Sequence, residues 1–163
     1  MSNKTGKILG GMVLAPFVLI ALGIAYCEAN KAYWDHKVKE MCEKDGGVTV
    51  FEKVKLTREE YEKNDGKNGA IHVMPESTSL RNHEYAWKSI DTVLHESNPD
   101  VWRTEYVTYR KSDRKELGKW ITYTRRGGDM PTGISHGSSF SCSDIADFDK
   151  NLTKKIFLFE GKY

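Results

Sequence analysis

The sequence predicts an α+β protein, in which a single N-terminal transmembrane helix continues into a helix packed on an antiparallel five- or six-stranded sheet. Three observations support this prediction: an uncharged apolar stretch at 8–26, good helix formers up to residue 45, and strand-like alternation after two glycines. The expected organisation is a short cytoplasmic tail (1–7), a transmembrane helix (8–26), a membrane-proximal helix (27–47) and a sheet domain (48–163).

The apolar stretch from Ile8 to Tyr26, ILGGMVLAPFVLIALGIAY, determines where the rest of the chain is held. At about 1.5 Å per residue, a helix of this length spans roughly 30 Å, the thickness of a bilayer's hydrocarbon core. Tyr26, Tyr33 and Trp34 are aromatic residues of the kind found at membrane interfaces. A cleaved signal peptide has a shorter apolar run, and a lipoprotein signal needs a small residue before Cys27, so a single-pass anchor is favoured.

The charges on either side of this stretch favour one orientation. Lys4, Lys7 and the amino terminus precede it, and Glu28 is the first charged residue after it. Because basic residues are retained on the cytoplasmic side, the N-terminus is expected inside and the C-terminal domain outside. Membrane lipid is then the expected partner of residues 8–26.

Beyond the apolar stretch, the composition is that of one domain without net charge. The chain has 25 Lys and Arg and 23 Asp and Glu residues, and Lys4 and Lys7 account for the difference of +2. A nucleic-acid-binding domain usually has an excess of basic residues on one face, so no nucleic acid is expected as a partner. No cofactor is expected either, and no metal site, because the histidines and cysteines lack His-x-x-x-His and Cys-x-x-Cys spacings.

Residues 27–45 are good helix formers and predict a helix that continues the membrane segment into water. Four apolar residues of this helix share one stripe at helical spacing: Ala32, Val38, Met41 and Cys42. Gly46 and Gly47 are expected to end the helix, because glycine accepts the left-handed backbone found at helix C-termini. The stripe either packs on the domain's own sheet or forms a stalk that binds a partner.

Strands are predicted at 48–54, 71–74, 85–96, 101–111, 117–126 and 156–159. Thr57, followed three residues later by Glu60, forms a capping-box pattern that predicts a short helix after the first strand. The three longest strands are joined by short polar turns, which favours an antiparallel meander. Their tryptophans, Trp87, Trp102 and Trp120, form either cross-strand core pairs or a carbohydrate- or peptide-binding platform. The last strand is expected to be central or paired with the first.

The three cysteines, Cys27, Cys42 and Cys142, allow one disulfide bond and one free thiol. In an oxidising compartment, Cys42–Cys142 is the favoured pair because it would tie the membrane-proximal helix to the last loop. In a reducing compartment, all three would remain thiols.

The segment from Arg125 to Cys142 is the part of the chain that looks most like a site, because it is long, irregular and rich in polar residues. Arg125 and Arg126 lie beside glycines and are candidates for binding an anion. Asp129, His136 and the serines include the residue types of a serine hydrolase, but a Gly-x-Ser-x-Gly turn is missing, so no catalytic residue is assigned. The third interpretation is a covering loop without chemistry.

Two blocks of residues resemble a family of small, uncharacterised bacterial membrane-anchored proteins. The first is CEKDGGV (42–48) with FEKV (51–54), and the second runs from RRGGD (125–129) to SSFSC (138–142). The resemblance implies a bacterial envelope, with the anchor in the inner (cytoplasmic) membrane and the domain in the periplasm. The resemblance implies no enzymatic activity for the chain. The two blocks also contain Cys42 and Cys142, which agrees with their pairing.

The expected function is that of a membrane-anchored extracytoplasmic domain that binds a partner protein or contributes to an envelope assembly, with no reaction assigned. The alternative is a membrane-tethered hydrolase or anion-binding enzyme that uses the loop 125–142. The expected protein partner has no assigned identity.

Overall fold

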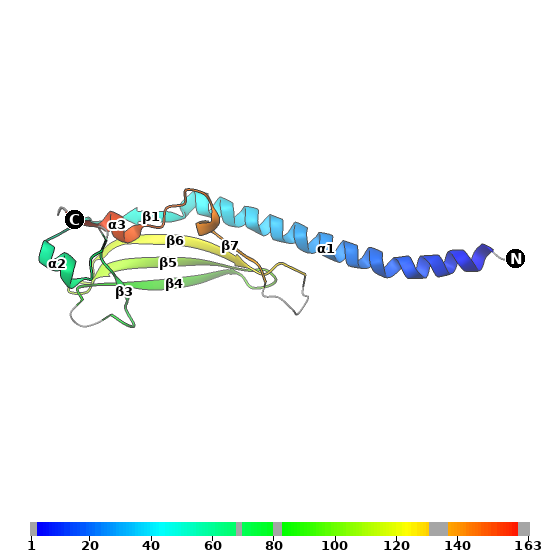
Figure 1. Cartoon of the computed structure of the whole chain (residues 1–163), viewed down its shortest axis with the longest axis horizontal. Coiled ribbons are helices and arrows are strands. Elements are labelled where there is room, and N and C mark those ends of the chain that lie inside the picture. The colour runs from blue at the N-terminus through cyan, green and yellow to red at the C-terminus, as the bar shows by residue number, and fades with distance from the viewer. Residues whose placement is uncertain (1–2, 68–69, 80–82, 131–136, 160–163) are drawn as a thin grey trace.

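The computed structural model describes residues 3–67, 70–79, 83–130 and 137–159, with the side chains of the first helix described from Ala15 onward. It contains a long helix and a mixed six-stranded sheet, which confirms the predicted α+β class. Figure 1 shows an elongated molecule. The C-terminal part of α1 (Asn3–Asp45) lies along the sheet, and its N-terminal part extends beyond the sheet.

The other elements follow α1 in an order close to the predicted one. They are β1 (Gly47–Val50), β2 (Val54–Leu56), α2 (Arg58–Lys63), β3 (Met74–Pro75), β4 (Tyr85–His95), β5 (Asp100–Arg110), β6 (Glu116–Arg126), β7 (Ser139–Ser141), a 3₁₀ turn η1 (Cys142–Asp144), α3 (Leu152–Ile156) and β8 (Phe157–Phe159). The main sheet has the order β1-β6-β5-β4-β3, with β7 also paired to β6. Its centre, β4-β5-β6, is the predicted antiparallel meander.

Three details of the predicted sheet are wrong. The sheet is mixed rather than antiparallel, because β3 pairs with β4 in parallel. The first predicted strand, 48–54, is divided into β1 and β2, and the strand predicted at 71–74 is reduced to β3. The last strand is not central: it pairs in a separate two-stranded sheet with β2, which begins at the last residue of the predicted first strand, Val54. Residues 152–156 form a short helix with Leu152 and Ile156 buried, so β8 begins only at Phe157.

Two local signals in the sequence are confirmed. α1 ends at Asp45, directly before the two glycines. The amide of Gly46 donates to a carbonyl one turn earlier (3.0 Å), and Gly47 has a φ of +99°, a conformation that favours glycine. At the start of α2, the Thr57 hydroxyl accepts from the Glu60 amide, and the Glu60 carboxylate accepts from the Thr57 amide (2.8 Å). This is the predicted capping box.

Two clusters of buried residues hold these elements together. One cluster lies between α1 and the sheet and contains Val38, Cys42, Val101, Ile121, Tyr123 and Cys142. The other joins α2, α3 and β8 to the sheet and contains Leu56, Tyr61, Ile71, Val73, Tyr85, Leu117, Leu152, Ile156 and Phe157. Val38, Met41 and Cys42 of the predicted stripe therefore pack on the domain's own sheet, whereas Ala32 is exposed.

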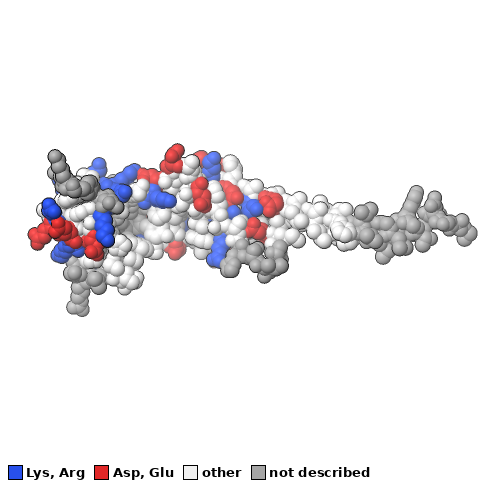
Figure 2. Space-filling model, in the orientation of Figure 1, with Lys and Arg blue, Asp and Glu red and all other residues white. Residues whose placement is uncertain are grey.

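Among the described residues, no other element lies beside the part of α1 that extends beyond the sheet, here named the projecting part (Figure 1), and Figure 2 shows no charged residue on the coloured section of it next to the domain. Every residue from Ala15 to Tyr26 is exposed. Within the described residues, no helix is both long enough and apolar enough to qualify as a membrane span. The predicted span, 8–26, begins outside the residues with described side chains, as does the predicted tail, 1–7.

Candidate functional site

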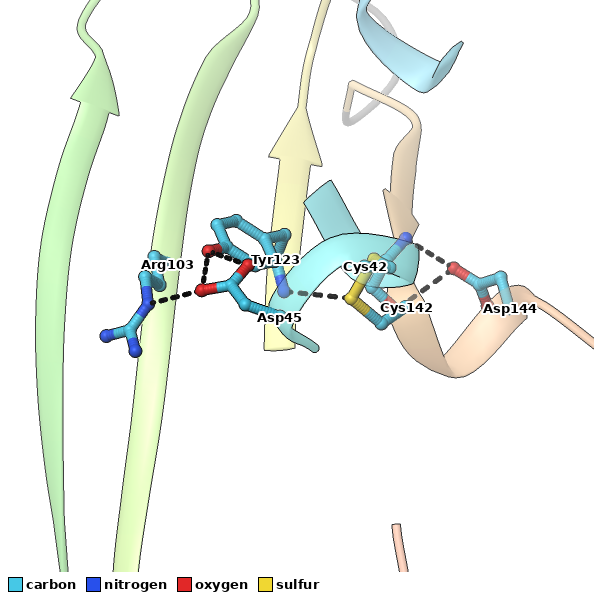
Figure 3. The surroundings of a disulfide bond; sticks show 7 residues. Cys42, Asp45, Arg103, Tyr123, Cys142 and Asp144 are labelled. Atoms are coloured by element: carbon cyan, nitrogen blue, oxygen red, sulfur yellow. Dashed lines mark hydrogen bonds and ion pairs between the residues drawn. A yellow bond between two sulfur atoms is a disulfide. The ribbon is translucent and has the colours of Figure 1, made fainter. Parts of the chain in front are cut away.

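A disulfide bond joins the end of α1 to η1, the turn that follows β7. Cys42 and Cys142 are bonded (S–S 1.96 Å, Cα–Cα 5.6 Å) across a sequence separation of 100 residues, which confirms the predicted pair. Both cysteines are buried, and the Tyr123 amide donates to the Cys142 sulfur (3.1 Å). Figure 3 shows the bond at the point where the helix meets the strand that carries Tyr123. Cys27 is the free thiol.

Polar contacts next to the disulfide hold the last turn of α1. The Tyr123 hydroxyl donates to the two oxygens of the Asp45 carboxylate (2.7 and 2.8 Å), and Arg103 lies 3.9 Å from the same carboxylate (Figure 3). Burial, and then the neighbouring Asp45, raises the pKa of Tyr123. Burial would raise the pKa of Glu105, but hydrogen bonds and charges from Arg103 and Lys119 lower it overall. These contacts therefore favour the charged form of Glu105 and the neutral form of Tyr123.

Arg125, the first of the predicted ligand-binding residues, is buried. Its side chain is 2% exposed, and its Nε donates to Oδ1 of Asp35 on α1 (2.6 Å). Its Nη1 donates to the carbonyl oxygens of Gly127 and Ser138. The guanidinium therefore connects α1, β6 and the loop after β6, and its described donors are directed at groups of the protein itself.

Of the other predicted residues of this loop, Asp129 is linked to Arg125 through Ser138, whose hydroxyl accepts from Arg125 Nη1 (3.2 Å). Asp129 accepts hydrogen bonds from the amide and the hydroxyl of Ser138 (3.0 Å for the hydroxyl), and its carboxylate lies 3.5 Å from Lys31. The bond from the Ser138 backbone, followed by that from its side chain, lowers the pKa of Asp129. Arg126 is exposed at the end of β6, and His136 lies outside the described residues. These are the contacts of a covering loop.

The predicted aromatic cluster is present with one different member. Trp87 contacts Tyr106 edge to face (5.5 Å between centroids, 69°), and Tyr106 stacks on Trp120 (4.8 Å, 16°). Tyr106 stands directly opposite Trp120, whereas Trp102 is opposite Thr124 and lies further along the sheet. The rings form the floor of a cavity of about 460 Å³ beside α3. Because the rings pack against one another, the arrangement favours cross-strand core pairs over a binding platform.

Sequence reasoning missed the outer side of β4. β3 pairs only with the beginning of β4, and the described chain places no strand beside the later residues. Residues 89–94 of β4, here named the open edge, are all exposed. They include Ile90 (48% exposed), Val93 (56%) and Leu94 (45%). The sequence contains no clear signal of this edge, because apolar residues occur on both sides of the strand.

A groove of about 410 Å³ adjoins the open edge near the turn between β4 and β5. Five residues line it, and together they are here named the acidic groove: Asp91, Val93, Glu96, Asp100 and Trp102. Asp91 accepts from the Thr104 hydroxyl (2.6 Å), and Asp100 accepts from the Ser97 amide (3.2 Å). Among the described residues, none of the three carboxylates has an ion-pair partner.

Comparison with known proteins adds no family: no family model, no curated protein and no solved structure matches the chain. The fold defines the chain as an α+β protein in which a disulfide bond holds a long helix against a mixed sheet. Its candidate functional surface is the open edge of β4 with the adjoining acidic groove.

Proposed function

We propose that this chain is a membrane-anchored protein of the bacterial envelope, of the kind that its two sequence blocks resemble, whose extracytoplasmic domain binds a partner protein. The observation that carries the proposal is the apolar surface of the projecting part of α1. Phe17, Val18, Leu19 and Ile20 are 66, 54, 69 and 51% exposed. Successive helical residues are about 100° apart, so four consecutive apolar side chains cover the whole circumference. Such a helix requires apolar surroundings on every side.

The energy involved favours insertion of this helix into a bilayer. Burying one large apolar side chain contributes about 1.5–3 kcal/mol, so the exposed side chains between Phe17 and Tyr26 together represent on the order of 10 kcal/mol. That is comparable with the stability of a whole domain, about 5–15 kcal/mol. The uncharged stretch 8–26 has the length that a bilayer requires.

The disulfide supports a location of the domain outside the cytoplasm. Disulfide bonds persist in oxidising compartments such as the periplasm and are rare in the cytosol. Cys42 and Cys142 both follow the apolar stretch, whereas Lys4 and Lys7 precede it, in accord with the positive-inside rule. The proposed arrangement is an inner-membrane protein with its N-terminus in the cytoplasm and its domain in the periplasm.

Partner binding is proposed in preference to catalysis because the described candidate site residues make contacts within the fold, whereas the edge of β4 is exposed. Arg125 and Asp129 are occupied by contacts within the fold. The open edge of β4, in contrast, presents backbone groups and apolar side chains to its surroundings. The hydrolase or anion-binding alternative stays a prediction, with no described contact in its favour.

Membrane extraction tests the anchor. The full chain, expressed in a bacterium with two membranes, should stay in the membrane pellet after an alkaline carbonate wash, and added protease should degrade the domain once the outer membrane is opened. A Val18→Arg/Leu19→Arg variant should be released, because each arginine at a helix centre disfavours insertion by about 2.5–3.5 kcal/mol. Glu59→Arg, an exposed change on α2, is the matched control and should stay in the pellet. Mature protein that begins beyond residue 26 and washes off freely would contradict the proposal.

A further inference from the structure

The open edge of β4 presents unpaired backbone groups on one side. Successive residues of a strand direct their N–H and C=O groups to opposite sides. The carbonyl of Trp87 accepts from the Glu76 amide, next to β3 (2.8 Å). The backbone groups of Ser89, Asp91 and Val93 therefore point to the same outer side, where the described chain places no further strand. An edge of this kind is a template for pairing with another strand.

The side chains around this edge define the charge of a suitable partner. The acidic groove holds three carboxylates beside Val93 and Trp102. Arg126 is opposite Asp100 in the strand register, but no ion pair joins the two among the described contacts. A segment with Lys or Arg side chains would meet this unpaired negative charge, and complementary charge both steers association and fixes the register.

A second copy of the chain does not fit the edge when both copies are anchored in one bilayer. α1 runs along β6, as the contacts of Asp35 and Asp45 with that strand show, and its axis follows the strands in Figure 1. Antiparallel pairing of two β4 edges about a two-fold axis would point the two α1 helices in opposite directions. Parallel pairing about a two-fold axis would place each residue of β4 directly opposite the same residue of the second copy. In a parallel ladder, the residues that form hydrogen bonds on one strand must alternate in height with those on the other strand, so this arrangement cannot form the ladder.

We propose that the open edge and the acidic groove bind an extended, basic segment of a partner protein, which adds to the sheet as a strand beside β4. The outward backbone groups of Ser89, Asp91 and Val93 supply main-chain hydrogen bonds, and the groove binds basic side chains. Successive side chains of the bound segment point to opposite faces of the sheet, so every second one lies on the face away from the groove and covers Ile90. This inference rests on the proposed function, because the anchor is what excludes self-pairing.

Vesicle flotation tests the anchor and the docking separately. The full chain is reconstituted in phosphatidylcholine vesicles, which have no net charge, and mixed with a labelled Lys-Val-Lys-Val-Lys-Val-Lys peptide or its glutamate counterpart. The chain should float with the vesicles and carry about tenfold more of the lysine peptide than of the glutamate peptide. Flotation of the chain without the lysine peptide, or with both peptides equally, would overturn the docking alone. A chain that does not float would overturn the anchor.

Three variants locate the binding surface. Val93→Pro removes an outward amide donor, a change that edge strands tolerate, and should weaken binding of the lysine peptide. Asp91→Asn/Glu96→Gln should weaken it about fivefold at low salt, with a smaller effect at high salt. The matched control, Glu59→Gln/Glu62→Gln, removes two exposed carboxylates of α2 and should bind as the wild type does.

Thermal melting followed by circular dichroism checks the fold of each variant, and if Val93→Pro does not fold, the carboxylate variant decides alone. Wild-type binding by a folded carboxylate variant, or an equal loss in the control, would overturn the inference. Concentration-dependent dimers of the wild type that Asp91→Asn/Glu96→Gln changes would assign the edge to a second copy and would overturn it too.

Discussion

The guanidinium of Arg125 donates a 2.6 Å hydrogen bond to the carboxylate of Asp35, and this pair joins β6 to the C-terminal part of α1. The Arg125 side chain is 2% exposed, whereas that of Asp35 is 32% exposed. The disulfide at Cys42 lies about two helical turns further along α1. An ionic contact and a covalent bond therefore fix the helix to the domain, in addition to the hydrogen bonds from Tyr123 to Asp45.

Replacing Arg125 with Met should lower the free energy of unfolding by about 3 kcal/mol, because Asp35 loses its partner and the loop carbonyls lose a buried donor. Urea unfolding followed by tryptophan fluorescence measures the change. Arg126→Met, at the exposed neighbouring position, is the control and should change stability by less than about 0.5 kcal/mol. Equal effects of the two substitutions would show that the Arg125–Asp35 pair does not hold the helix.

Cys142→Ser should lower the free energy of unfolding by about 4 kcal/mol, because the bond closes a loop of 100 residues that restricts the unfolded chain. The urea midpoint of the variant, compared with that of the oxidised wild type, gives the effect. Cys27→Ser removes the free thiol and should leave the midpoint unchanged. Mass spectrometry of non-reduced protein from its native membrane provides the direct check, and recovery of Cys42 and Cys142 as thiols would contradict this prediction.

Asp129 should contribute to a loss of stability in acid. Hydrogen bonds from the backbone and side chain of Ser138 hold the pKa of Asp129 below its ordinary value of 3.8. The stability linked to a lowered pKa is complete above the ordinary value and is lost as the pH falls through the folded-state value. Asp129→Asn should therefore be less stable than the wild type at neutral pH and approach it well below pH 3.8. A difference in urea midpoints that is the same at all pH values would exclude this cause.

Tyr123 should make the fold sensitive to alkali. Burial, and then Asp45, raises the pKa of Tyr123 above its ordinary value of 10.0, so the unfolded chain loses this proton first and stability falls as the pH rises past that value. Tyr123→Phe should lower stability by about 1 kcal/mol at neutral pH, because Asp45 loses a donor. Its stability should then decline less steeply in alkali. Tyr33→Phe, at an exposed position of α1, should keep the wild-type decline, and an equally steep decline in Tyr123→Phe would refute the assignment.

Sequence reasoning predicts the features that depend on neighbouring residues. Gly46–Gly47 ends α1, Thr57 and Glu60 cap α2, and the three long strands begin and end within a residue of the expected positions. The disulfide is also predicted correctly, because pairing Cys42 with Cys142 ties the membrane-proximal helix to the last loop.

The features that sequence reasoning missed depend on segments that meet from far apart in the chain. The parallel pairing of β3, the pairing of β8 with β2, and the exchange of Trp102 for Tyr106 beside Trp120 all depend on strand register. Arg125 looked like an anion ligand because its partner, Asp35, lies 90 residues earlier on α1. The open edge of β4 was not predicted because a strand becomes an edge only when no other strand pairs with it, and that depends on how distant segments pair.

α1 lies lengthwise on β6, and its last turn is bonded to Cys142. In a chain inserted in a bilayer, a pull on the domain away from the lipid would act along the strands. The load would then be shared in shear by the Arg125–Asp35 pair, the packed helix and the disulfide, instead of peeling these contacts apart one at a time.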